Sequence, residues 1–263
     1  MRVGGNTSCI AFAHDGALPS LILDAGTGIR QVSRLLGGGP FRGAIVFGHL
    51  HWDHTQGLPF FRAADHPGSS VAVYVPAQGD TEEVLSRFMS PPHFPIRPGE
   101  LRGQWTFNGL EPGEHEIEGF NVLALEIPHK GGRAFGYRVT DGTGVVTYMS
   151  DHCPTVLGSG PAGLGAYHEA AVTLASSSDV LFHDAQYLDA ELPALASFGH
   201  SASGYAVGLA EAAGVKLLLL FHHDPNRTDD EVDALASSYA GSGVAVDVAR
   251  EGMVIDFASP DRA

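Results

Sequence analysis

Four side chains that bind metal ions fall within six residues in the first quarter of the chain. His49, His51, Asp53 and His54 come directly after the apolar run 44–47. Imidazole nitrogen and carboxylate oxygen suit zinc, manganese or iron, and the lack of a cysteine in this stretch favours an open catalytic site over a closed structural one. The spacing therefore predicts a catalytic metal site. The alternative is a histidine-rich surface loop that binds metal only incidentally.

The expected backbone around these donors predicts how they are positioned. If the run 44–47 is a buried strand, His49 and His51 leave it at a period of two and point the same way. Asp53 and His54 fall in the next turn, which can begin a helix with Asp53 near its N-terminus. We therefore expect the four donors to converge on one pocket that can hold two neighbouring metal ions.

Polar side chains also follow most of the other predicted strands. They recur after apolar segments at Asp24, His129, Asp151, His183-Asp184 and His222-His223-Asp224. The strand before His222 has five apolar residues in succession, which indicates burial on both faces. Asp24 is expected to orient groups beneath the metal site rather than to bind phosphate. One edge of the sheets should therefore collect nearly all of the chemistry.

The remaining pattern predicts an α/β chain. Strands are expected at 8–14, 21–23, 44–47, 71–75, 120–127, 136–140, 145–149, 180–182, 216–221, 244–248 and 253–257, and helices at 29–36, 81–89, 166–176, 202–213 and 229–240. Thr228 is a candidate cap for the last helix. The segment 90–98 holds four prolines in nine residues, so it is expected to run extended along the surface, as a lid or as a plain connection.

Length and composition favour one domain in a reducing compartment. The 263 residues, 44% of them hydrophobic, can bury a sizeable core, so a single hydrolase domain over 1–263 is expected. Cys9 and Cys153 are far apart in sequence and are expected to be reduced. No secretory signal is evident, and no apolar run reaches the roughly 20 residues that span a bilayer. We therefore expect a cytoplasmic protein.

The charge balance restricts the partners. Fifteen Lys and Arg residues against 30 Asp and Glu residues give a net charge of −15, which repels a polyanion. We therefore expect a small-molecule substrate, with no long nucleic acid and no membrane as partner. A homodimer is compatible with this composition.

The residues singled out above resemble the signature of the metallo-β-lactamase superfamily over nearly the whole chain. The H-x-H-x-D-H motif runs from His49 to His54, and the later matching positions are His129, Asp151 and His222. The resemblance implies a four-layer αββα sandwich of class α/β. It also implies two divalent ions, zinc first and manganese or iron as alternatives: the first held by His49, His51 and His129, the second by Asp53, His54 and His222, with Asp151 bridging both.

Two further segments resemble one branch of the superfamily. Gly199-His200-Ser201 and Phe182-His183-Asp184-Ala185 look like the branch that holds tRNase Z and phosphodiesterases for small cyclic phosphates. The tRNA-processing members also carry a protruding basic, glycine-rich arm. No long insertion with clustered Lys and Arg occurs in this chain, which favours a small substrate.

The donor set supports hydrolysis without reference to the family. Two divalent ions about 3.5–4 Å apart activate a shared hydroxide and offset the charge on a phosphoryl or carbonyl oxygen. His200 is the candidate general acid for the leaving alkoxide, and Asp184 is the candidate for holding its imidazole. Asp53 completes the candidate catalytic set. The alternative for His200 is that it caps a helix beginning near Ser201.

These observations predict a dinuclear metal-dependent hydrolase. We expect a phosphodiesterase that acts on a small phosphodiester such as a cyclic nucleotide. Lactone, thioester or amide hydrolysis on the same metals is an alternative. A metal-dependent binding or carrier protein with little turnover is a second alternative.

Overall fold

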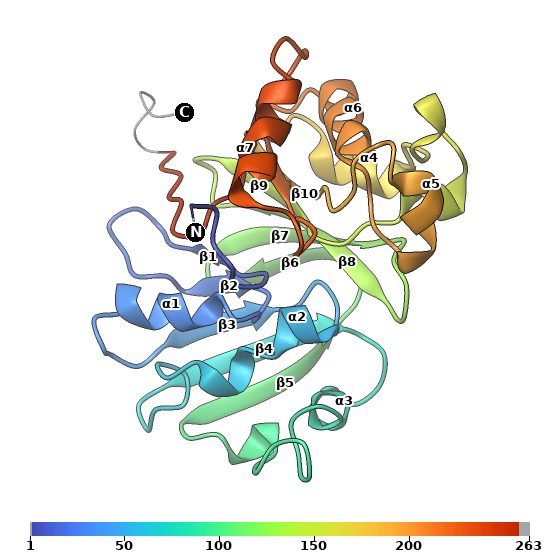
Figure 1. The fold of residues 1–263 in the computed structure, drawn as a ribbon. Coiled ribbons are helices and arrows are strands. Elements are labelled where there is room, and N and C mark those ends of the chain that lie inside the picture. The colour runs from blue at the N-terminus through green and yellow to red at the C-terminus, as the bar shows by residue number, and fades with distance from the viewer. Residues whose placement is uncertain (1, 258–263) are drawn as a thin grey trace. The chain divides into compact units, whose positions relative to one another are not determined.

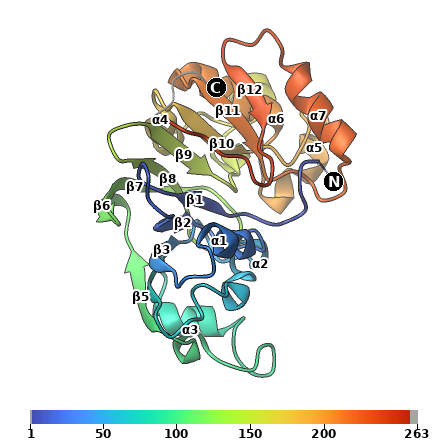
Figure 2. The same cartoon turned by 90° about the vertical axis from the view of Figure 1, so that its left-hand side faces the viewer.

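A computed structural model describes residues 2–257 and divides them into two compact units. The N-terminal unit comprises Asn6–Glu111 and Glu116–Gly119, and the C-terminal unit comprises the rest of the described residues. The N-terminal unit contains a five-stranded sheet, and a seven-stranded sheet runs through the C-terminal unit. Figures 1 and 2 show both sheets with their helices. Whether the units form the predicted single domain stays a prediction.

The sheet of the N-terminal unit has the order β1-β2-β3-β4-β5. Its strands are β1 (Ile10–Phe12), β2 (Leu21–Leu23), β3 (Arg42–Val46), β4 (Ser70–Pro76) and β5 (Gln104–Leu110). β1 and β2 form an antiparallel pair, and β2 to β5 run parallel. Because parallel strands are covered on both faces, β2 and most of β3 consist of buried apolar residues.

Three helices belong to the N-terminal unit: α1 (Ile29–Leu35), α2 (Trp52–Thr55) and α3 (Thr81–Ser86). Short 3-10 turns lie at Leu58–Phe60 and Pro98–Glu100. Ile29 and Val32 of α1 join the same buried core as Ile22 and Ile45 of the sheet, so α1 covers one sheet face (Figure 1). β2 pairs with β3 up to Leu23 and Val46, so the ends of the two strands lie next to each other.

The sheet of the C-terminal unit has the order β12-β11-β10-β9-β8-β7-β6. Its strands are β6 (Gly113–Ile117), β7 (Phe120–Ile127), β8 (Ala134–Thr140), β9 (Val145–Met149), β10 (Val180–Asp184), β11 (Leu217–Phe221) and β12 (Ala245–Val248). β7, β8 and β9 are antiparallel, whereas β9 to β12 are parallel. The carboxyl ends of β9, β10 and β11 therefore meet at one edge, as expected for strands that carry polar residues there.

The same unit contains the helices α4 (Glu169–Ala175), α5 (Leu192–Leu195), α6 (Ser203–Ala213) and α7 (Asp229–Ser238). It also contains 3-10 turns at Pro154–Leu157, Pro161–Gly163 and Ala196–Phe198. α4 and α6 lie side by side (Figure 1), and Leu174 and Leu209 share a core with Leu218 of β11. Thr228 caps α7 in a reciprocal capping box with Glu231, which confirms the predicted cap.

Most predicted elements agree with the structure within a few residues, but several regions differ. Residues 253–257 form no strand: Val254 is 85% exposed, so burial does not offset the entropy of ordering a strand there. The segment 90–98 is turned rather than extended, because the backbone N–H groups of His93 and Phe94 both donate to Ser90 O at 2.8 Å. β5, β6 and α5 were not predicted. Among residues 2–257, no helix has the length and hydropathy of a membrane span.

Candidate metal centre

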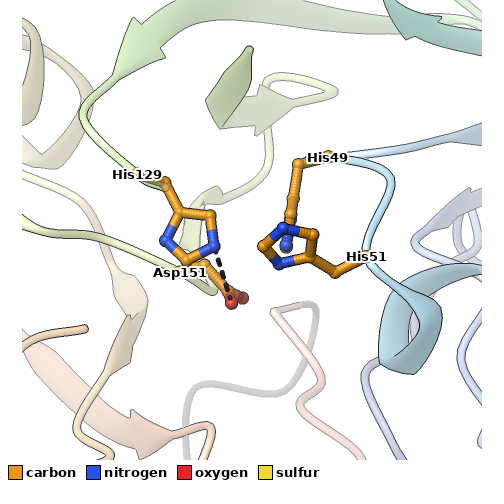
Figure 3. A group of neighbouring side chains, drawn as sticks. All are labelled: His49, His51, His129 and Asp151. Carbon is orange, nitrogen blue, oxygen red and sulfur yellow. Dashed lines mark ion pairs between the residues drawn. The ribbon is translucent and has the colours of Figure 1, made fainter. Parts of the chain in front are cut away.

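The first group of predicted ligands lies on the loop between β3 and α2. His49 is 3% exposed, and its ring centroid lies 4.5 Å from that of His51 and 4.2 Å from that of His54. Figure 3 shows the rings of His49 and His51 side by side. Asp53 and His54 lie in the first turn of α2, as predicted. The N-terminal unit thus brings its three predicted imidazole ligands together.

Asp24 fixes the geometry of this loop from below. Its backbone follows β2 with a positive φ of 60°, a conformation that Asp tolerates better than most residues. Oδ1 accepts the backbone N–H of Gly48 at 2.7 Å, and Oδ2 lies 2.6 Å from His54 Nδ1. Because a buried carboxylate accepts, Nδ1 of His54 carries the proton and Nε2 carries the lone pair. The prediction that Asp24 orients groups beneath the site is confirmed.

Two glycines allow the turn after β2 to pack directly against residues 53–57, which follow the first candidate ligands. A Cβ on Gly57 would lie 2.0 Å from the carbonyl oxygen of Gly26, and a Cβ on Gly26 would lie 2.3 Å from that of Asp53. The contact is closed by hydrogen bonds from Ala25 N to His54 O and from Gly57 N to Ala25 O. Any side chain at either glycine would therefore push these segments apart.

The second group of predicted ligands surrounds Asp151, which follows β9 in the C-terminal unit and is 2% exposed. Asp151 Oδ2 lies 3.6 Å from His129 Nε2 and 3.5 Å from His222 Nε2. Figure 3 shows His129 turned toward Asp151. Two ligand atoms that each lie about 2.0–2.2 Å from one tetrahedral ion are about 3.3–3.6 Å apart. Each of these two distances therefore suits a pair of ligands on one ion, Asp151 with His129 and Asp151 with His222.

The other ring nitrogens of these histidines are held by the protein. His129 Nδ1 lies 2.7 Å from the carbonyl oxygen of Gly199, which can only accept, so Nε2 carries the lone pair. His222 Nδ1 lies 3.1 Å from the side-chain amide of Gln186. His222 also has a positive φ of 56°, an uncommon conformation that tilts it away from the direction of β11. Gln186 was not predicted, although it lies only two residues beyond Asp184.

Asp184, at the end of β10, holds the predicted acid His200. Its Oδ2 lies 3.0 Å from His200 Nδ1, and the same oxygen accepts the backbone N–H groups of His152 and Ser201. His200 Nδ1 is 3.7 Å from Asp151 Oδ2, and Tyr187 packs its ring edge against His200. The Asp184 carboxylate therefore keeps a proton on Nδ1 of His200 and leaves Nε2 as the nitrogen that can face a substrate.

The alternative structural role of His200 finds no support. Helix α6 begins at Ser203, and its N-cap residue is Ala202 without a side-chain cap. Ligand atoms of Asp184, His200 and His222 lie within 4.8 Å of one another, so this part of the C-terminal unit also has the donors of a cation site. His200 and His222 stack at a centroid distance of 4.9 Å.

The remaining histidines near the ligands are buried. His152 and His223 were expected to point away from the ligand side, and burial lowers the pKa of both, to about 4 for His223. His183, expected in the core or behind the site, is fully buried. Burial also raises the pKa of Tyr187 to about 12. All four side chains are therefore neutral at neutral pH.

The donors in each unit fit a divalent ion. Imidazoles whose second nitrogen donates to a carboxylate or a carbonyl are the usual ligands of zinc and similar metals. His54 in the N-terminal unit and His129 in the C-terminal unit both have this arrangement. Nothing in either donor set requires a soft metal, because no cysteine takes part.

Comparison with known proteins places the chain in a family. The family described as "Beta-lactamase superfamily domain" matches residues 20–223. The chain belongs to the metallo-β-lactamase superfamily. Within it, the chain lies in the branch that resembles tRNase Z. It is a metal-dependent hydrolase.

Relatives and solved structures agree with this assignment. Ribonuclease Z of Natronomonas pharaonis is 22% identical over 97% of this chain and 94% of its own length. Ribonuclease Z of Exiguobacterium sibiricum is 41% identical over 71% of this chain and 73% of its own length. The metallo-β-lactamase fold protein YhfI from Bacillus subtilis has a TM-score of 0.69, with 19% identity over 95% of this chain and 92% of that one. The predicted α/β fold of the superfamily is thereby confirmed.

Proposed function

We propose that this chain is a dinuclear phosphodiesterase. The first ion would be held by His49, His51 and His129, the second by Asp53, His54 and His222, and both by Asp151. The donor chemistry favours zinc, with manganese and iron as alternatives. When bound, such ions supply an activated hydroxide and neutralise charge on the phosphoryl oxygens. Asp53, with a side chain 40% exposed, is the most accessible carboxylate among the ligands.

The pair of Asp184 and His200 is the observation that carries the proposal. The alkoxide that leaves a phosphodiester needs a proton. A histidine whose Nδ1 is hydrogen-bonded to a carboxylate can donate that proton from Nε2. Asp184 Oδ2 lies 3.0 Å from His200 Nδ1 and so fixes the orientation of the ring. A thioester leaves as a thiolate and gains less from such an acid, so this pair favours phosphodiesters over thioesters. The relatives named ribonuclease Z favour phosphodiesters over lactones and amides.

A small phosphodiester such as a cyclic nucleotide is the proposed substrate. The net charge of −15 repels a long polyanion, and no segment of the sequence clusters Lys and Arg to offset it. RNA is the second candidate, because the two sequence relatives described above are both named ribonuclease Z. Both substrates use the same bond chemistry, and they differ in how many phosphates the protein must attract.

Hydrolysis by the metal-loaded protein tests this proposal. Bis(p-nitrophenyl) phosphate, cyclic AMP and a short RNA are offered to protein reconstituted with zinc or manganese, with Asp151→Ala as the blank. We expect turnover of the small diesters that is lost in the blank. Turnover of RNA alone would favour the second candidate. If none reacts although two ions are bound per chain, the phosphodiesterase proposal is wrong, and a carrier role or another hydrolysis replaces it.

The acid is tested separately with His200→Ala. Loss of a general acid costs about 10²–10⁴ in rate for a poor leaving group. We therefore expect cyclic AMP hydrolysis to fall by that factor while metal content is unchanged. An activated substrate with a nitrophenolate leaving group should fall much less. Equal losses for both substrates would assign His200 to metal binding instead.

A further inference from the structure

Three histidines outside the proposed ligand set form a continuous chain in the C-terminal unit. His152 Nδ1 lies 3.0 Å from His183 Nε2, and His152 Nε2 lies 2.7 Å from His168 Nε2. His183 Nδ1 lies 2.8 Å from the carbonyl oxygen of Asp184. His152 and His183 are fully buried, whereas His168 is half-buried at the start of α4. The chain therefore runs from the molecular surface to Asp184.

The carbonyl at one end sets the direction of every hydrogen bond in the chain. A carbonyl oxygen only accepts, so His183 carries its proton on Nδ1 and accepts on Nε2. His152 must then donate from Nδ1 and accept on Nε2. His168 completes the chain by donating from Nε2. Two of the three rings thus carry the Nδ1 proton and one carries the Nε2 proton. The chain cannot pass a proton onward to Asp184, because a carbonyl does not take one up.

The three-histidine chain is linked to the Asp184 carboxylate through the backbone of His152. The N–H of His152 donates to Asp184 Oδ2 at 2.9 Å, and its carbonyl accepts Ser201 Oγ at 2.7 Å. Asp184 Oδ2 is the oxygen that holds His200. With its ring fixed on both sides, His152 has no freedom to turn, and its N–H stays aimed at this oxygen.

A tyrosine packs against the same rings. The Tyr205 ring lies 5.4 Å from His152 and 5.5 Å from His183, and its hydroxyl donates to the carbonyl oxygen of Ala166 at 3.0 Å. Ala166 lies two residues before His168. Tyr205 therefore joins the inner part of the histidine chain to the segment that carries its outer end.

We propose that His168 is a positioning residue for the Asp184–His200 pair, acting through His152. The inference rests on the proposed function of His200 as the acid, because positioning matters only if that pair takes part in the reaction. A side chain that donates from the place of Nε2 is sufficient for this role. Glutamine meets that requirement, since its amide nitrogen can occupy nearly the same place, and alanine does not. His168→Gln and His168→Ala thus form a matched pair.

Nitrogen NMR tests the chain without any substrate. In zinc-loaded protein with ¹⁵N-labelled histidine, we expect the Nδ1 proton on His152 and His183 and the Nε2 proton on His168. His168→Ala should shift the signal of the His200 Nδ1 proton, whereas His168→Gln should leave it close to the wild-type position. An unshifted His200 signal in His168→Ala, or Nε2 protons on His152 and His183, would overturn the inference even if the protein is an active phosphodiesterase.

Kinetics provide the second test. His168→Ala should lower kcat by about tenfold, the smaller end of what loss of an outer hydrogen-bond partner costs. KM and metal content should stay unchanged, and His168→Gln should recover most of the rate. A simple packing role predicts that both variants lose thermal stability together with activity. If no substrate is turned over but the NMR shifts appear as expected, the proposed function is wrong and the positioning of His200 stands.

Discussion

Asp24 shows how one buried carboxylate can orient a candidate ligand that it contacts at 2.6 Å, although the two residues are 30 positions apart in sequence. Asp24→Asn keeps the acceptor for Gly48 N and the tolerance for a positive φ, but it places an amide N–H against the proton on His54 Nδ1. We expect His54 to lose its orientation and zinc affinity to fall about 10–100-fold. Competition with a chromophoric chelator measures this.

A second Asp→Asn substitution in the same unit tests whether losing any carboxylate would weaken zinc binding. Asp65→Asn removes a surface partner of Arg102, whose guanidinium lowers the pKa of the Asp65 carboxyl. It should leave zinc affinity unchanged. Wild-type affinity in Asp24→Asn would show that His54 needs no buried partner.

Gln186 contacts the candidate ligand His222 in the way that Asp24 contacts His54. In the structure the amide nitrogen Nε2 of Gln186 lies 3.1 Å from His222 Nδ1. For His222 to bind an ion through its own Nε2, its Nδ1 must carry the proton, so the Gln186 amide must turn and present its oxygen there. Gln186→Glu keeps an acceptor and should hold or tighten the second ion. Gln186→Leu removes it and should weaken that ion about tenfold. Zinc titration of the two variants checks this, and equal binding of both ions in Gln186→Leu would contradict it.

At the scale of elements, the turn after β2 and the loop before α2 are held by glycine-to-backbone contact. Gly57→Ala should clash with the carbonyl oxygen of Gly26 at 2.0 Å and destabilise the fold by about 1–3 kcal/mol. Gly68→Ala is the control, because its nearest neighbour is a His66 side-chain atom at 3.4 Å. Urea unfolding measures both. A Gly57→Ala midpoint as high as that of the control would show that the two segments can move apart at little cost.

The sequence predicts those elements whose pattern matches their burial. β7 and β9 have the predicted bounds, because each starts and stops at a clear turn signal. β5 was missed because its residues are mostly half-buried or exposed, so no run of apolar residues marks it. At 253–257 a strand was predicted that the structure does not have, because apolar residues such as Val254 lie exposed there. Hydrophobic pattern thus predicts buried strands well and surface segments poorly.

The site shows the same division. Ligand candidates were predicted because several end apolar strands, and strand ends of one parallel sheet meet at one edge. The residues behind them were mostly missed. Gln186 contacts His222 and His168 contacts His152, but both stand in no motif, and their partners lie 36 and 16 residues away. Asp24 is the exception, because it ends a strand next to a glycine-rich turn. Contacts between a candidate ligand and the side chain that orients it depend on tertiary packing. They join residues far apart in sequence, so no local pattern marks them.

For the whole molecule, the charge of −15 should govern how anionic substrates arrive. Raising ionic strength from about 0.01 M to 0.15 M shortens the Debye length from about 30 Å to about 8 Å, so it screens repulsion at long range. We expect kcat/KM for cyclic AMP to rise with salt, and that for a short RNA to rise more steeply because it carries more phosphates. A protein built to grip nucleic acid shows the reverse, since its affinity falls as salt rises. Metal content measured at each salt concentration separates screening from loss of ions. A kcat/KM for RNA that falls with salt would reveal a local basic surface strong enough to outweigh the net charge, and would make RNA the better candidate substrate.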